Sequence, residues 1–434
     1  RNHISGDKVK GKTQRESECM AQFYENKEVE ERVILVGIST GQDEDTEGSL
    51  EELKELVKTA GAETIGTVIQ NRESAHPATY LGKGKIDEVK WMVWETEATG
   101  IVCDDELSPA QLRNLEEALD TKVMDRTMVI LDIFASRART REGKIQVELA
   151  QLRFRAARLV GMRNSLSRLG GGIGTRGPGE TKLEVDRRLI HQRIGQLKAE
   201  LEDVKRHRQV QREQRTRNRV PVAAIVGYTN AGKSTLLNRL TNAGILAEDK
   251  LFATLDPTTR TLALPGGQEL LLTDTVGFIR KLPHHLIEAF KSTLEEARYC
   301  DMILHVVDCS SPRMEMQMYV VYETLRQLEI QDKVMVTVFN KIDQLPENVT
   351  LRDFSADYQV KISAKTGEGI PELLELFETI LRGRNVYLEK TFPYSEAGKI
   401  QLIRKSGQLL EEEYGPEGIQ VKAYVPAEMF HLFF

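Results

Sequence analysis

A glycine-rich loop between an apolar strand and a helix restricts most strongly how this chain can fold. The loop follows the predicted strand VPVAAIVG (220–227), precedes the predicted helix TLLNRL (235–240) and matches the pattern GxxxxGK[ST]. Glycines let backbone N–H groups surround phosphates, and the helix N-terminus adds positive potential. We therefore predict a phosphate-binding loop made of Gly227, Tyr228, Thr229, Asn230, Ala231, Gly232, Lys233, Ser234 and Thr235.

Three later motifs, each placed after a predicted strand, extend this site. DTVG follows ELLLT (269–273), NKID follows VMVTVF (334–339), and SAK follows YQVKI (358–362). The aspartate of NKID can accept hydrogen bonds from the N1–H and the amine of guanine, which adenine cannot match, and the SAK backbone would contact the guanine carbonyl. The motifs predict GTP and GDP as ligands, contacted by Asp274, Thr275, Val276, Gly277, Asn340, Lys341, Ile342, Asp343, Ser363, Ala364 and Lys365.

A threonine-rich segment between the loop and DTVG has the composition of a switch that closes over magnesium. We favour Thr254 as the magnesium ligand, because FATLDP resembles the switch segment FTTLxP of ribosome-associated bacterial GTPases. Thr258 stays open as an alternative. The nucleotide contacts predicted in this segment are Phe252, Ala253, Thr254, Leu255 and Asp256.

Phosphoryl transfer depends mostly on positioning and charge neutralisation, which assigns roles to a few of these residues. Lys233 is expected to reach the β- and γ-phosphates and Gly277 to direct its N–H at the γ-phosphate. Ser234 and Thr254 would bind Mg²⁺ directly and Asp274 through water. Phe278 stands where many GTPases place a water-orienting glutamine. Because phenylalanine cannot orient water, we predict slow intrinsic hydrolysis that a partner accelerates.

Charge is distributed unevenly along the 434 residues. The chain has a net charge of −6, yet residues 137–219 contain 22 Lys and Arg against 9 Asp and Glu, a net of +13, so the remainder carries −19. Two long helical patterns in this block flank the glycine-rich segment RLGGGIGTRGPGETK (168–182). A basic helical hairpin fits a polyanionic partner. A solvated helical spacer is the alternative.

Changes in composition and in hydrophobic periodicity divide the chain into five segments. We predict a flexible leader (1–31), an N-terminal α/β domain with a mainly parallel sheet (32–136), the basic hairpin (137–219), a P-loop GTPase domain with a mixed sheet flanked by helices (220–383) and a small β-rich C-terminal domain (384–434). In the last of these, KIQLIRKSG (399–407) is expected to be extended. The longest apolar runs are too short to span a membrane.

Taken together, GYTNAGKST, LFATLDPTTR, DTVGFIRKLPHHLIEAFKSTLEEA, NKID, SAKTG and GGIGTRGPGETKLEVDRR resemble the HflX GTPases. The resemblance implies a GTP hydrolase that binds the large ribosomal subunit, is stimulated by the ribosome and splits stalled or idle ribosomes after stress. It implies a monomer in the cytoplasm, with an organelle matrix left open. The hairpin would contact ribosomal RNA through Arg163, Arg168, Gly171, Gly172, Arg176, Lys182, Arg187 and Arg188.

The resemblance also bears on cofactors. Mg²⁺ is expected. Asn230 occupies a loop position that, in related GTPases, helps hold a potassium ion against the phosphates, so K⁺ is a second candidate and Asn230 a catalytic one beside Lys233 and Gly277. Equal rates of GTP hydrolysis in KCl and NaCl would exclude a catalytic potassium ion.

Several features of the N-terminal domain have two interpretations. GKGK (82–85) fits a small ATP-binding phosphate loop or a basic turn, and Asp104, Asp105 and Asp125 fit a metal site or helix caps. Trp91 and Trp94 are expected in the core or an interface. Two other functions also stay open: a signalling-type GTPase whose hairpin docks a protein partner, and an ATP-dependent RNA-remodelling enzyme.

Overall fold

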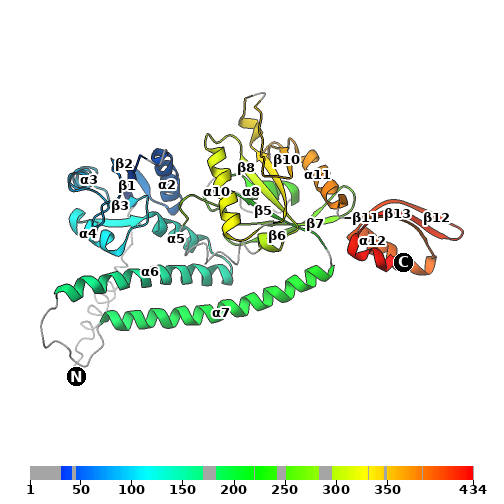
Figure 1. The fold of residues 1–434 in the computed structure, drawn as a ribbon, viewed down its shortest axis with the longest axis horizontal. Helices are drawn as coiled ribbons and strands as arrows, with labels where there is room; N and C mark the ends of the chain where they lie inside the picture. The colour runs from blue at the N-terminus through cyan, green and yellow to red at the C-terminus, as the bar shows by residue number, and fades with distance from the viewer. Residues whose placement is uncertain are drawn as a thin grey trace, which may run out of the picture.

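The computed structural model describes residues 31–41, 45–169, 182–218, 220–241, 251–282, 296–330, 332–346, 349–383 and 385–433. Three sheets and a long helical hairpin follow one another along the chain (Figure 1). The predicted fold class is confirmed: a P-loop-type mixed sheet is preceded by an α/β unit and followed by an antiparallel sheet. Within the described ranges, no helix is both long and apolar enough to cross a membrane.

The N-terminal unit is a four-stranded parallel sheet covered by helices on both faces. Its strand order is β2-β1-β3-β4. Val33 and Leu35 pack toward α2 and α5, while Ile34 and Val36 pack toward α3 and α4. A strand buried on both faces has to be apolar throughout, which explains VILVGI. The elements are β1 Arg32–Ser39, α2 Thr46–Ala60, β2 Glu63–Asn71, α3 Lys83–Thr96, β3 Gly100–Cys103, α4 Pro109–Leu119, β4 Lys122–Asp125 and α5 Arg126–Arg137.

The structure bears on two features of this unit that had two interpretations each. Trp91 and Trp94 on α3 are 57% and 78% exposed, which rules out the core, while the interface stays a prediction. GKGK begins a helix: Gly82 is the N-cap of α3, the helix starts at Lys83, and Lys85 pairs with Glu88 at 2.8 Å. This geometry favours the basic turn, and a phosphate loop here stays a prediction.

The hairpin consists of α6 (Arg141–Leu169) and α7 (Lys182–Asn218), which lie side by side beneath the two larger sheets (Figure 1). Ile145 and Leu149 of α6 pack on Ile194 and Leu197 of α7 and close the space between the helices. The predicted leader, except for Glu31, and the glycine-rich tip lie outside the described residues.

The central unit has a six-stranded sheet in the order β10-β9-β8-β5-β7-β6, in which only β6 runs antiparallel to its neighbour. Alternate residues of β5 face helices on opposite sides, so Ile225 packs with α8 and α11 and Val226 with α10. The elements are β5 Val222–Gly227, α8 Lys233–Thr241, β6 Thr258–Ala263, β7 Glu269–Asp274, β8 Met302–Asp308, α10 Met314–Gln327, β9 Val334–Asn340, η1 Ile342–Gln344, β10 Tyr358–Lys361 and α11 Ile370–Gly383.

The C-terminal unit is an antiparallel sheet in the order β11-β13-β12, with one helix packed on it. The expectation of an extended segment at residues 399–407 is wrong, because α12 covers most of it. Ile400 and Ile403, one helical turn apart, are both buried against the sheet, and this tertiary contact decides in favour of helix. The elements are β11 Asn385–Phe392, η2 Tyr394–Glu396, α12 Ala397–Ser406, β12 Gln408–Gly415, β13 Gly418–Pro426 and η3 Ala427–Phe433.

One apolar cluster joins the first three units. It contains Leu53 of α2, Phe134 of α5, Phe154 of α6 and Val226 of β5, together with residues of the segment 251–255. The nucleotide loop and the base of the hairpin therefore share one packed interior, which can transmit displacements because it is nearly incompressible.

Candidate functional site

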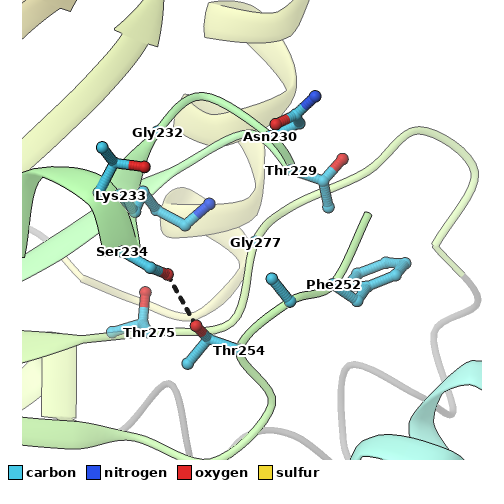
Figure 2. Close-up of a pocket in the computed structure, with 11 residues that line it drawn as sticks. Thr229, Asn230, Gly232, Lys233, Ser234, Phe252, Thr254, Thr275 and Gly277 are labelled. Carbon is cyan, nitrogen blue, oxygen red and sulfur yellow. Dashed lines mark hydrogen bonds between the residues drawn. The ribbon is translucent and has the colours of Figure 1, made fainter. Parts of the chain in front are cut away.

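The phosphate-binding loop is the turn that links β5 to α8. It lines a pocket together with the segment 252–254 and the end of β7 (Figure 2). Gly232 has a φ of +91°, and a Cβ there would lie 2.3 Å from the Asn340 side chain, so glycine is required. The pocket is lined by Thr229, Asn230, Gly232, Lys233, Ser234, Thr235, Phe252, Ala253, Thr254, Thr275 and Gly277, all of which the sequence predicted as site residues.

Lys233 is buried at the bottom of this pocket. Its Nζ donates to the carbonyl oxygens of Gly227 at 3.2 Å and Tyr228 at 2.7 Å. Burial lowers the pKa of Lys233 to about 8, against the opposing effect of Asp274. A Cβ on Gly277 would lie 2.9 Å from this Nζ, so the chain after β7 approaches the lysine as closely as only glycine permits. The pocket thus contains a buried amine that can neutralise a phosphate group.

Three oxygen-bearing side chains converge beside the lysine. Ser234 Oγ lies 2.8 Å from Thr254 Oγ1 (Figure 2). It also lies 2.8 Å from Asp274 Oδ2, and Thr254 Oγ1 lies 3.1 Å from the same carboxylate oxygen. Asp274 is fully buried, burial raises its pKa, and its Oδ1 has no hydrogen-bond partner within the described residues. A hard divalent cation prefers such a set of oxygens. The set brings together the three residues predicted to hold Mg²⁺.

The alternative threonine lies elsewhere. Thr258 is the first residue of β6 and pairs with Asp274 through the backbone register of the sheet. Its neighbour Thr259 contacts Thr273 at 3.0 Å across the strands. The geometry therefore favours Thr254 over Thr258 as the ligand.

The predicted base-reading residues meet at the other end of the loop. Asn340 donates to the Ala231 carbonyl at 2.9 Å and accepts from the Ala364 N–H at 2.9 Å. Ser363 Oγ donates to Asp343 Oδ1 at 2.6 Å, which fixes the carboxylate. Lys341 pairs with Asp308 at 2.7 Å.

Sequence reasoning missed one residue at this end. Arg239 of α8 donates to the carbonyl oxygens of Ala364 at 3.2 Å and of Lys365, and so ties the SAK loop to the helix that begins in the phosphate-binding loop. The sequence does not predict this contact, because an arginine in the last turn of a helix is usually exposed to solvent.

Other predicted nucleotide contacts direct their side chains away from the pocket. Leu255 and Val276 are buried in the shared apolar cluster, and Ile342 packs in a smaller cluster behind NKID. Asp256 bonds to the backbone before α6. Phe278 is 2% exposed in the shared cluster, and its N–H donates to the Gly227 carbonyl at 3.1 Å. Phe278 therefore packs behind the loop, as its apolar side chain requires.

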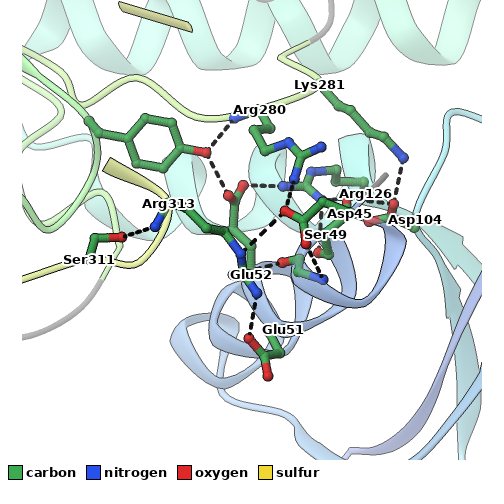
Figure 3. A network of polar contacts seen from close by, with 12 residues as sticks. Asp45, Ser49, Glu51, Glu52, Asp104, Arg126, Arg280, Lys281, Ser311 and Arg313 are labelled. Carbon is green, nitrogen blue, oxygen red and sulfur yellow. Dashed lines mark hydrogen bonds and ion pairs between the residues drawn. The ribbon is translucent and has the colours of Figure 1, made fainter. Parts of the chain in front are cut away.

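The Tyr228 side chain also leaves the pocket and bonds to Glu52. Glu52 belongs to a polar network between the N-terminal unit and the central unit, which includes Arg126 and Asp104 (Figure 3). The Tyr228 hydroxyl donates to Glu52 at 2.5 Å and accepts from the Arg280 N–H at 2.9 Å. Lys281 donates to Asp104 at 2.5 Å and to Asp105 at 2.6 Å. Two basic residues just after DTVGF are thus held by acids of the N-terminal unit, a pairing that local sequence patterns do not reveal.

These contacts also bear on the proposed metal site of the N-terminal unit. Asp104 and Asp105 pair with Lys281, and Asp125 pairs with Arg158 at 2.6 Å while capping α5 through the Met128 N–H. Among the described residues, no three His, Cys, Asp or Glu side chains lie together in a way that could hold a metal ion. The structure favours ion pairs and caps over metal binding for the three aspartates.

Arg126 is the central cation of the network and is 1% exposed. It donates to Asp104 at 2.7 Å and to Glu52. Burial alone would raise the pKa of Asp104, but Arg126 and Lys281 outweigh it, so the pKa of Asp104 lies below its usual value. The stabilisation is therefore present at neutral pH and is lost as acid protonates Asp104.

Replacing Arg126 with Ala should lower the free energy of unfolding by about 3–5 kcal/mol, because buried carboxylates lose their partner. Urea unfolding at pH 7 measures the loss, and the deficit should shrink as the pH falls below about 4. Arg113→Ala removes an exposed pair with Glu117 as a matched control and should cost less than about 1 kcal/mol. Equal effects of the two variants would contradict the assignment.

The residues predicted to contact RNA are only partly described. Arg187 is partly exposed and Arg188 exposed on α7. Arg163, Arg168 and Lys182 lie on the hairpin helices, but their side chains are outside the described residues, as are Gly171, Gly172 and Arg176 entirely.

Known proteins resemble this chain over nearly its whole length. It is 77% identical to the GTPase HflX of Lacrimispora saccharolytica over 411 residues, which cover 95% of this chain and 97% of that relative. The chain belongs to the HflX GTPase family. The HflX of Escherichia coli is 42% identical over 93% of this chain and 95% of its own length, and that of Caldanaerobacter subterraneus 51% identical over 95% and 94%.

Family descriptions match three consecutive parts of this HflX GTPase. "GTP-binding GTPase N-terminal" matches residues 47–135, "GTP-binding GTPase Middle Region" residues 137–215, and "50S ribosome-binding GTPase" residues 222–341. A GTP-binding protein of Sulfolobus solfataricus, solved with GDP, is 23% identical with a TM-score of 0.43 over 80% of this chain and 98% of its own. The predicted family is confirmed, and with it a GTP-binding domain that hydrolyses GTP.

Proposed function

We propose that this HflX GTPase binds the large ribosomal subunit in its GTP state and splits stalled or idle ribosomes under stress, and that GTP hydrolysis releases it. The observation that carries the proposal is the basic hairpin, whose helix α6 is packed against the nucleotide loop through the shared apolar cluster. The description "50S ribosome-binding GTPase" for residues 222–341 supports the choice of partner.

The hairpin has the properties of an RNA-binding arm. Its two helices bury Ile145, Leu149, Ile194 and Leu197 against each other, and most of the charged side chains whose burial the structure describes on α7 are exposed. With a net of +13 over residues 137–219, the arm can displace the counterions of ribosomal RNA, which a neutral spacer cannot do.

The same proposal assigns the roles of the pocket. Lys233 neutralises the β- and γ-phosphates, and Asp343 and Asn340 order the guanine site. Ser234 and Thr254 would bind Mg²⁺ directly and Asp274 through water. The ion would supply charge neutralisation on the phosphates. A potassium ion beside Asn230, which lines the pocket with a φ of +61°, belongs to the proposal as well.

Phe278 gives a reason for a slow intrinsic rate. Because its side chain is buried behind the loop, it cannot order the attacking water, so the proposal requires that the ribosome completes the site. Arg280 and Lys281, two and three residues after Phe278, bond to Asp45 and Asp104 of the N-terminal unit, so a ribosome that moves this unit would also move the segment behind the loop.

Co-sedimentation with purified large subunits, in a non-hydrolysable GTP analogue and at rising salt, tests the partner. The logarithm of the affinity should fall linearly with the logarithm of the salt concentration, and Arg187→Glu with Arg188→Glu should reduce the slope by about one per lost phosphate contact. Lys54→Glu with Lys58→Glu, an exposed pair on α2, is the matched control. Salt-independent binding would instead favour a protein partner and a signalling role.

A further inference from the structure

The switch segment 251–256 makes a direct polar contact with the base of the hairpin. Asp256 Oδ2 accepts from the N–H groups of Arg139 at 2.9 Å and Thr140 at 2.8 Å, and Asp256 Oδ1 accepts from the Thr140 hydroxyl at 2.5 Å. Thr140 Oγ1 in turn accepts from the Gly143 N–H at 2.9 Å. Thr140 thus caps the first turn of α6, and Asp256, more than a hundred residues later in the sequence, holds this capping residue in place.

Asp256 follows closely on a residue that lines the nucleotide pocket. Thr254, two residues before Asp256, reaches Ser234 and Asp274. Phe252 packs edge-on against Phe134 of α5 with ring centroids 4.7 Å apart. The segment therefore has one side in the nucleotide pocket and the other on the helices that carry the hairpin.

We propose that Asp256 is a positioning residue that couples the nucleotide state to the hairpin. With GTP bound, Thr254 would stay beside Ser234 and Asp274, and Asp256 would hold Thr140, the residue that caps α6; with GDP bound, the segment would move away and Thr140 would lose this support. Coupling of this kind is reciprocal, so a contact between Asp256 and Thr140 that favours the GTP state must also raise the affinity for GTP. The inference rests on one part of the proposed function, namely that GTP binding closes the segment 251–256 over the pocket.

Gly143 offers a selective way to break the contact. A Cβ at this position would lie 2.3 Å from Asp256 Oδ1 and 3.3 Å from its carboxyl carbon. Alanine is a better helix former than glycine, so Gly143→Ala favours α6 itself while it expels the carboxylate. Gly195→Ala on α7 is the matched control, because a Cβ at Gly195 meets nothing within 4 Å.

The experiment measures the affinities of purified full-length variants for fluorescent GDP and for a fluorescent non-hydrolysable GTP analogue. Gly143→Ala should bind the analogue about fivefold more weakly, because Asp256 no longer holds the capping residue Thr140 and one cap contributes about 1 kcal/mol; GDP affinity should be unchanged and the melting temperature no lower than that of the wild type. Gly195→Ala should match the wild type. Unchanged analogue affinity in Gly143→Ala, or an equal loss for both nucleotides, would overturn the proposal.

Asp256→Ala provides a second variant without a steric clash. It should show the same selective loss, and adding Gly143→Ala to it should have no further effect, because the carboxylate that the new methyl group displaces is gone. Additive losses would contradict the coupling. Since no ribosome is present, this outcome is independent of whether the protein binds the large subunit.

Discussion

Replacing Asp343 with Asn should lower the affinity for GTP by about 100-fold and create affinity for xanthosine triphosphate. The Ser363 hydroxyl donates to Asp343 Oδ1 at 2.6 Å and so holds the carboxylate in one orientation. The amide NH2 of asparagine is a donor and would face the exocyclic amine of guanine, which is also a donor. Xanthine has a carbonyl oxygen in place of that amine and can accept the hydrogen bond. Competition binding with GTP, XTP and ATP measures the shift.

The matched control for this variant is Asp332→Asn. Asp332 is exposed in the same domain and has a φ of +60°, which asparagine tolerates. It should leave all three affinities unchanged. Undiminished GTP binding by Asp343→Asn would mean that NKID does not read the base.

Lys233→Ala should reduce the rate of GTP hydrolysis by at least about 100-fold, since it removes the only cation buried in the pocket among the described residues. Lys361→Ala, an exposed lysine on β10, should hydrolyse GTP at the wild-type rate. Single-turnover hydrolysis at saturating GTP separates the chemical step from binding.

The melting temperature of Lys233→Ala shows whether slow hydrolysis comes from the missing amine or from a destabilised fold. Burial lowers the pKa of Lys233 to about 8, so the charged amine destabilises the empty protein below that pH. The nucleotide-free Lys233→Ala protein should therefore melt at least as high as the wild type at pH 7. A lower melting temperature together with slow hydrolysis would indicate a packing role instead.

Local patterns in the sequence were sufficient to predict the pocket. The loop between β5 and α8 and the Thr254 segment meet there, at the carboxyl ends of the parallel strands. Their positions follow from the course of the backbone in such a sheet, which motifs placed after strands are enough to predict. The directions of the side chains were harder to predict. Tyr228 and Asp256 occupy the predicted backbone positions, but Glu52 and Thr140 draw their side chains away from the nucleotide.

Long-range contacts account for the remaining errors. The segment 399–407 has strand-like composition, yet burial of Ile400 and Ile403 on a sheet makes it helical. Trp91 and Trp94 lie on the outer face of α3, while Ile86 and Val89 fill the core. Arg239 and Arg126 gave no sequence signal because their partners are distant in the chain. The proposed domain boundaries stay predictions.

Light scattering of purified 70S ribosomes mixed with this protein tests most directly whether GTP drives it to separate the subunits. With a non-hydrolysable GTP analogue the scattering should fall to the level of free subunits, and with GDP, or with Lys233→Ala, it should stay at the level of intact ribosomes. Intact ribosomes in the presence of the analogue, or equal splitting with GDP, would contradict a GTP-controlled ribosome-splitting factor.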